Sequence, residues 1–204
     1  MKLGKTPTDG KLHAYCIRCR RETIRERSDR GRPAYHCLNC NAVSPRALII
    51  DPAISWWLGE DGEYWHETAG TFVRNLRDEF LFFERVKYPF GLTIPAGHVD
   101  RSESPVDAAR RELFEEAGFG LPLRAFKLVV FEKMLGDECY RGSDAHRWNA
   151  YVARMRSNAT VKVNTRESVR PRWLTLEQAL RSNPTFALRS LITRHAGNIL
   201  RGQL

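Results

Sequence analysis

The sequence predicts an α+β protein in which a few helices pack on a mixed sheet, with a small separate module in front of it. Three observations predict this class. Segments of strand length outnumber helical ones, one helix over 105–117 is marked at both ends, and four of the five cysteines lie in the first 46 residues. The 204 residues, 42% hydrophobic and 28% charged, are enough to bury a core and are ordinary for a soluble globular protein.

The charge pattern predicts the same division. Residues 1–46 contain 11 Lys/Arg and 4 Asp/Glu, a formal charge of +7, whereas the remaining 158 residues contain 22 and 20, a charge of +2. We therefore expect a basic module over 1–46 and a nearly neutral domain over 47–204. A polyanionic partner is one explanation of such an asymmetry.

The cysteines of the module form two C-x2-C pairs, and 17 residues separate the pairs. This spacing is typical of a zinc ribbon, in which a metal supplies much of the folding energy of a module too small for its own core. The predicted zinc ligands are Cys16, Cys19, Cys37 and Cys40. Disulfides or free thiols are the alternative. We expect Cys139 to be a buried or loop thiol.

The chain begins Met-Lys-Leu-Gly-Lys-Thr-Pro, without an apolar segment of the secretory type, and it has no run of the roughly 18 apolar residues that a membrane span needs. We therefore expect a cytoplasmic protein without a membrane partner, in which disulfides are disfavoured relative to zinc.

Arginines are frequent between the two cysteine pairs, but Glu22, Glu26 and Asp29 interrupt them. A nucleic-acid-binding module would place such arginines on phosphates. The alternative, which the mixed signs favour, is a solvated hairpin on a structural ribbon.

Strands account for most of the predicted elements of 47–204. An apolar stretch opens at Ala47, and Asp61-Gly62 is a turn signal between two short strands. Further strands are predicted over 71–76, 79–83, 92–94, 126–131 and 148–155, and further helices near 176–182 and 185–195. Phe82, Phe83 and Trp148 are predicted core residues.

The helix over 105–117 has start and stop signals. Ser104 is a good N-cap, Pro105 suits the first helical position, and Asp107 completes a pair similar to a capping box. Gly118 suits a left-handed C-cap. Val106, Ala109, Leu113 and Ala117 form one apolar stripe that is expected to face the sheet.

Three glutamates of this helix, Glu112, Glu115 and Glu116, share one face at i, i+3 and i+4. Their carboxylates repel one another, and a hard divalent cation such as Mg²⁺ or Mn²⁺ would remove the repulsion. A cation held there would neutralise a diphosphate and activate water. A solvated acidic face paired with Arg110 and Arg111 is the alternative.

Residues 97–119 match the pattern G-x5-E-x7-R-E-U-x-E-E-x-G-U, where U is a bulky apolar residue, at every specified position. This is the Nudix box, and the chain resembles the Nudix hydrolases. The resemblance implies an α/β/α sandwich with a mixed sheet, and metal-dependent hydrolysis of a nucleoside diphosphate linked to another group X. It implies that Gly97, Glu112, Glu115 and Glu116 bind Mg²⁺ or Mn²⁺, and that Glu103 and Arg111 form an ion pair.

The general base is expected to be Glu112 or a carboxylate outside the box, for which Glu167 resembles a family position. A zinc ribbon in front of a Nudix domain resembles the NADH pyrophosphatase branch, although the S-Q-P-W-P-F-P-x-S run of that branch is missing. Substrate choice is expected to lie in the loop 136–146, where Tyr140 would stack on a base and Arg141 would hold a phosphate, unless it is an ordinary exposed loop. Arg85 is a third expected substrate-binding residue.

The sequence leaves three functions open. The favoured one is a pyrophosphohydrolase of nucleotides or dinucleotides with a structural ribbon. The others are a hydrolase that the ribbon recruits to RNA 5′ ends, and a nucleotide-sensing regulatory module without turnover. A homodimer is left open as well.

Overall fold

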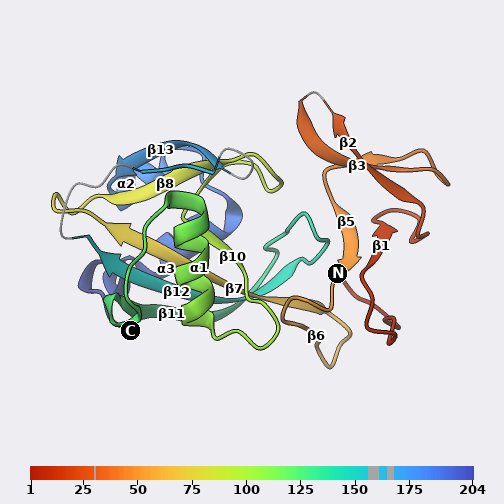
Figure 1. Ribbon diagram of the computed structural model, residues 1–204, viewed down its shortest axis with the longest axis horizontal. Helices are drawn as coiled ribbons and strands as arrows, with labels where there is room; N and C mark the ends of the chain where they lie inside the picture. The colour runs from red at the N-terminus through yellow and green to blue at the C-terminus, as the bar shows by residue number, and fades with distance from the viewer. Residues whose placement is uncertain (30, 156–160, 165–167) are drawn as a thin grey trace.

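The computed structural model describes residues 1–29, 31–155, 161–164 and 168–204. The ribbon and a larger body lie side by side (Figure 1). The body is built on a mixed sheet with strand order β11-β12-β7-β8-β13, in which β12 and β7 are parallel and the other neighbours on this path are antiparallel. Short strands β6 and β10 pair with β7, and β9 pairs with β8. The bounds are β6 Trp56–Leu58, β7 Tyr64–Arg74, β8 Phe80–Arg85, β9 Leu92–Thr93, β10 Ala96–His98, β11 Phe126–Leu135, β12 Ala145–Arg154 and β13 Ser168–Leu174.

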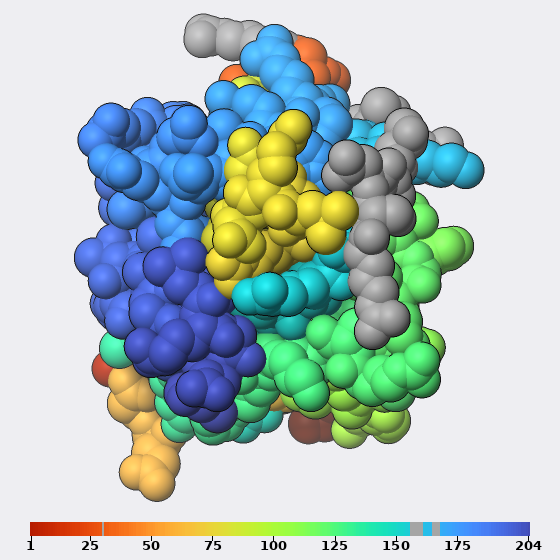
Figure 2. Space-filling view, turned by 90° about the vertical axis from the view of Figure 1, so that its left-hand side faces the viewer, coloured from red at the N-terminus to blue at the C-terminus, as the bar shows by residue number. Residues whose placement is uncertain are grey.

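Helices cover both faces of this sheet. Helix α1 (Pro105–Ala117) lies on one face, and α2 (Leu176–Leu180) and α3 (Phe186–Arg201) lie on the other. A single 3-10 turn, η1 (Leu123–Ala125), precedes β11. Seen from the end away from the ribbon, the blue chain of α2 and α3 and the green chain of α1 flank the yellow β7–β8 turn (Figure 2). The predicted α/β/α sandwich is confirmed.

Two apolar cores result from the alternation of side chains along the strands. Phe82 and Trp148 belong to the core under α2 and α3, and Phe83 belongs to the core under α1, as expected for neighbours that point to opposite faces. Ala109, Leu113 and Ala117 are buried in the second core, and Val106 packs against it. The predicted apolar stripe of α1 therefore does face the sheet.

One strand prediction is wrong. The segments around Tyr64 and over 71–76 are one eleven-residue strand, β7, in which every residue is buried. The stretch between them, His66 to Gly70, lacks apolar alternation, but β10 and β12 on its two sides and α1 on one face help to bury it. The polar side chains of β7 thus become part of the interior.

The N-terminal module contains the hairpin β2 (Ile24–Asp29) and β3 (Arg32–Cys37) with β4 (Val43–Ser44), and a second pair, β1 (His13–Cys16) with β5 (Ala47–Ile50). Because β5 pairs with β1, the segment that leads from the ribbon to the body is itself a strand of the N-terminal module. No helix in the described part of the chain is long and apolar enough to cross a membrane.

Candidate active site and metal centres

The loop and helix over 97–118 are held in place by the caps that the sequence indicates. The Ser104 side chain accepts a hydrogen bond from the Asp107 backbone N–H, and Gly118 ends the helix in the left-handed conformation at φ 75°. The helix begins and ends where it was predicted, at Pro105 and Ala117. Its glutamates are therefore presented from a rigid element.

Arg111 joins the loop to the helix. Its guanidinium donates to both oxygens of Glu103, at 3.1 and 2.9 Å, and to the His98 carbonyl at 3.1 Å. The same side chain reaches Glu112 at 2.7 Å and Glu115 at 3.4 Å. Hydrogen bonding to Glu103 is the largest cause that raises the pKa of Arg111. This geometry keeps the box loop in register with two of the predicted metal ligands.

The three glutamates differ in their surroundings. Glu116 is 3% exposed, and it accepts hydrogen bonds from the Ala96 N–H at 2.9 Å and from the Ser168 hydroxyl at 3.3 Å. Glu112 is 8% exposed and packs over Gly97, where a β-carbon would overlap its carboxylate. Glu115 is exposed. A β-carbon at position 97 would therefore displace the Glu112 carboxylate.

These oxygen donors suit a hard divalent cation. Glu112, Glu115 and Glu116 line one open pocket of about 280 Å³ together with Gly97. Mg²⁺ and Mn²⁺ prefer carboxylate and carbonyl oxygens, so this donor set fits the cations expected from the sequence.

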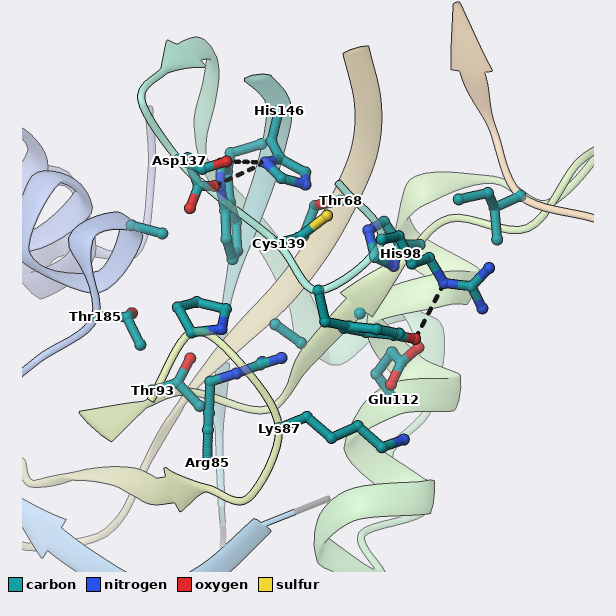
Figure 3. Close-up of a pocket in the computed structure, with 18 of the residues that line it drawn as sticks. Thr68, Arg85, Lys87, Thr93, His98, Glu112, Asp137, Cys139, His146 and Thr185 are labelled. Carbon is teal, nitrogen blue, oxygen red and sulfur yellow. Dashed lines mark hydrogen bonds and ion pairs between the residues drawn. The ribbon is translucent and has the colours of Figure 1, made fainter. Parts of the chain in front are cut away.

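Basic side chains face the glutamates across the pocket. Arg85, the last residue of β8, and Lys87 point into the pocket from the side opposite Glu112 (Figure 3). The buried Nε of Arg85 has no hydrogen-bond partner among the residues that the structure describes. A pocket lined by both carboxylates and cations can hold a metal and a phosphate together.

The other two predicted substrate residues also reach this pocket. Tyr140 and Arg141 lie in the β11–β12 loop and line the wall next to the glutamates. The Arg141 Nε donates to the Tyr140 hydroxyl at 3.0 Å, and Arg141 forms an ion pair with Asp51. This loop is not an ordinary exposed one, because Asp137, Cys139 and Ser143 within it are buried.

The ribbon side holds the same loop. The Ala47 and Ile49 N–H groups of β5 donate to the carbonyls of Tyr140 and Arg141, both at 3.0 Å. Arg46 donates to the carbonyl of Cys139 at 3.0 Å. A second pocket, of about 490 Å³, lies between ribbon and body, and Lys87, Tyr140 and Arg141 line both pockets.

The four ribbon cysteines form a cluster. Their sulfur atoms all lie within 4.8 Å of one another, with Cys16 and Cys40 at 3.7 Å and Cys19 and Cys37 at 3.6 Å. All four are free thiols. A hydrogen bond from Thr23 is the largest cause that lowers the pKa of Cys37 to about 6. Four thiolates at these separations could hold one tetrahedral zinc ion.

Some residues fall outside these expectations. Glu167 lies outside the residues that the structure describes. Lys87 was not singled out in the sequence. Cys139 is buried as expected, but His66, His98 and His146 surround it. Burial is the largest cause that lowers the pKa of both His66 and His98. No short-range pattern marks this group.

Comparisons with known proteins agree with the geometry. The family model described as the NUDIX domain matches residues 65–194. This match covers more than half of the chain, and the chain therefore belongs to the Nudix domain family.

Individual relatives are more distant. A curated protein from Lactococcus lactis subsp. cremoris (strain MG1363), described as a probable DHNTP pyrophosphohydrolase, is 49% identical over 43 residues, which are 21% of this chain and 26% of that protein. The chain thus matches only about a quarter of the length of this curated relative.

Solved structures share the fold. An Ap4A hydrolase from C. elegans superposes with a TM-score of 0.54 and 25% identity over 67% of this chain and 98% of its own. The Nudix domain of NrtR from Shewanella oneidensis, solved with ADP-ribose, has a TM-score of 0.54 and 20% identity over 64% and 85%. A MutT protein from Methanosarcina mazei Go1 has a TM-score of 0.53 and 20% identity over 64% and 91%.

Proposed function

We propose that this protein is a Mg²⁺- or Mn²⁺-dependent pyrophosphohydrolase that cleaves the diphosphate bond of a nucleoside diphosphate linked to a group X. The observation that carries the proposal is the pocket in which Glu112, Glu115 and Glu116 face Arg85 and Lys87. The family membership and the names of the relatives, which include a pyrophosphohydrolase and an Ap4A hydrolase, support the reaction class.

One set of residues in the pocket would bind the metal, and a second set would bind the substrate. Gly97 and the three glutamates would hold the cation, which when bound neutralises a diphosphate and lowers the pKa of bound water. Glu116 is oriented by Ala96 and Ser168, so its carboxylate requires little reorganisation. Arg111 is a positioning residue, because it acts through Glu103 and Glu112.

Arg85 and Lys87 would bind the phosphates of the substrate. The Arg85 Nε is a buried donor without a partner in the described part of the chain, and a phosphate oxygen would satisfy it. Lys87, whose ammonium lies 5.6 Å from the centre of the Tyr140 ring, adds a positive charge where the two pockets share lining residues. Glu112 or Glu167 would accept the proton of the attacking water.

The ribbon would hold one structural zinc ion through Cys16, Cys19, Cys37 and Cys40. The ribbon also lines the second pocket, through Arg27 and Tyr35. This pocket would bind the X group. Substrate would then span both pockets at Lys87, Tyr140 and Arg141.

A hydrolysis screen tests the proposal. The substrates are NADH, ADP-ribose, dinucleoside polyphosphates, nucleotide sugars and deoxynucleoside triphosphates, each with Mg²⁺ or Mn²⁺ and each with EDTA. We expect metal-dependent release of a nucleotide product from at least one class. Metal-independent release would contradict the assignment of the glutamates, and no release from any class would contradict the proposed activity.

A further inference from the structure

A second group of metal-ligating side chains lies beside the proposed active site. His66 of β7, His98 of β10, Cys139 of the β11–β12 loop and His146 of β12 each offer one ligand atom, and these atoms all lie within 4.8 Å of one another. His98, Cys139 and His146 also line the pocket that contains the glutamates (Figure 3). The group is distinct from both the ribbon cysteines and the glutamates.

The strand pairing explains why these side chains meet. His66 and His146 are direct partners in the parallel pair β7–β12, so their side chains point to the same face of the sheet. His98 belongs to β10, which pairs with the other side of β7 and faces Thr68 two residues beyond His66. Cys139 completes the group from the loop that leads into β12. Three neighbouring strands and a loop thus converge on one point.

The separations match those of ligands around one tetrahedral ion. Zinc binds histidine nitrogen at about 2.0–2.1 Å and cysteine sulfur at about 2.3 Å, which gives tetrahedral edges of about 3.3–3.6 Å. The His66 Nδ1 lies 3.0 Å from the His98 Nε2 and 3.7 Å from the Cys139 Sγ. Small shifts would bring all four donors to bonding distance.

A carboxylate orients one of the histidines. The His146 Nδ1 lies 2.8 Å from the Asp137 carbonyl and 3.1 Å from the Asp137 carboxylate, as the dashed lines in Figure 3 show. The Trp148 indole fixes that carboxylate with a hydrogen bond of 2.7 Å. This contact occupies Nδ1 and leaves Nε2 to face the cluster, which is the arrangement common to metal-bound histidines.

Three of the four side chains of the cluster are buried. His66 is fully buried, and its Nδ1 faces His98 and Cys139. His146 and Cys139 are 3% and 6% exposed. Burying two imidazoles and a thiol against the half-buried His98 is unfavourable, and one shared metal ion would offset the cost for the donor atoms that face one another.

We propose that His66, His98, Cys139 and His146 form a second transition-metal site, which binds Zn²⁺. Nitrogen and thiolate donors select zinc over Mg²⁺, which keeps this site chemically separate from the glutamates. Four protein ligands close the coordination shell, so the bound ion is structural. It ties the β11–β12 loop, with Tyr140 and Arg141, to the strand that carries Gly97.

Zinc content of the full chain tests this. Protein purified without chelators and equilibrated with Zn²⁺, then with excess Mg²⁺ to displace zinc from the glutamates, is analysed by native mass spectrometry. We expect two zinc ions per chain in the wild type and in Glu116→Gln, and one in Cys139→Ser. His195→Asn is the control, because His195 pairs with Glu132 outside the cluster, and it should keep two.

A second measurement needs no variant. X-ray absorption at the zinc edge of the wild type should give an average of about 2.5 sulfur and 1.5 nitrogen ligands per zinc, whereas a ribbon site alone gives about 4 sulfur. One zinc per chain with sulfur ligands only, or two zinc ions retained in folded Cys139→Ser, would overturn the proposal. Neither readout depends on turnover, so a failure of the proposed hydrolysis leaves this test intact.

Discussion

Replacing Gly97 by alanine tests the geometry of the proposed metal site with one methyl group. The added β-carbon would overlap the Glu112 carboxylate, whereas ordinary contact begins at 3.4 Å. The carboxylate must therefore retreat by more than about 1 Å, a displacement that can lower a rate about 100-fold when it affects a reacting group. The displaced group is the far end of a flexible side chain, so we expect little loss of stability.

We expect Gly97→Ala to lose about 100-fold in kcat/KM and to need more Mg²⁺ for half-maximal activity, while it remains folded. The assay is initial rate against Mg²⁺ concentration, with thermal melting in parallel. Gly120→Ala is the matched control, because among the described residues its β-carbon would approach only Phe114 Cδ2, at 4.0 Å. Activity of Gly97→Ala within about threefold of the wild type at all Mg²⁺ concentrations would refute the close packing of Glu112 on Gly97.

Three further predictions concern the supports of the site. Arg111→Lys cannot keep both hydrogen bonds to Glu103, so we expect a lower melting temperature and a loss of about 10-fold in kcat/KM; an unchanged rate would contradict its positioning role. Arg27 lines the second pocket and Arg25 does not, so Arg27→Ala should raise KM about 2- to 5-fold and Arg25→Ala should not. If both variants instead lowered the affinity for RNA equally, recruitment to RNA would be favoured. Burial raises the pKa of Asp144, but pairing with Arg46 outweighs it and lowers the pKa below 3.8, so its contribution to stability is present above pH 3.8 and lost as the pH falls through the lowered value. The melting temperatures of the wild type and Asp144→Asn should therefore differ at pH 7 and converge below pH 3.8, and a constant difference would contradict the pairing.

The sequence predicted those parts of the protein whose causes are local. Helix α1 begins and ends as predicted because Ser104 and Gly118 lie next to it in the chain. The ribbon cysteines were found because each C-x2-C pair presents two ligands from one turn. The box glutamates share a helix, so their spacing alone places them on one face.

Features that depend on strand order could not be predicted in this way. His66 and His146 meet only because β7 and β12 are adjacent and parallel, and 73 residues separate His66 from Cys139. The middle of β7 was missed for a related reason, because its polar residues are buried by neighbouring strands and not by their own pattern. Lys87 follows β8 in the chain, and only the fold places it in the same pocket as the glutamates of α1.

The most direct test of the proposed reaction compares wild type with Glu116→Gln at saturating Mg²⁺ on the best substrate of the screen. Glutamine removes one charge from a proposed metal ligand that Ala96 and Ser168 hold by hydrogen bonds, and we expect kcat to fall by about 100- to 1,000-fold. Glu177→Gln, which alters an exposed glutamate of α2, should keep the wild-type rate. A Glu116→Gln enzyme as active as the wild type would contradict the assignment of this pocket as the catalytic metal site.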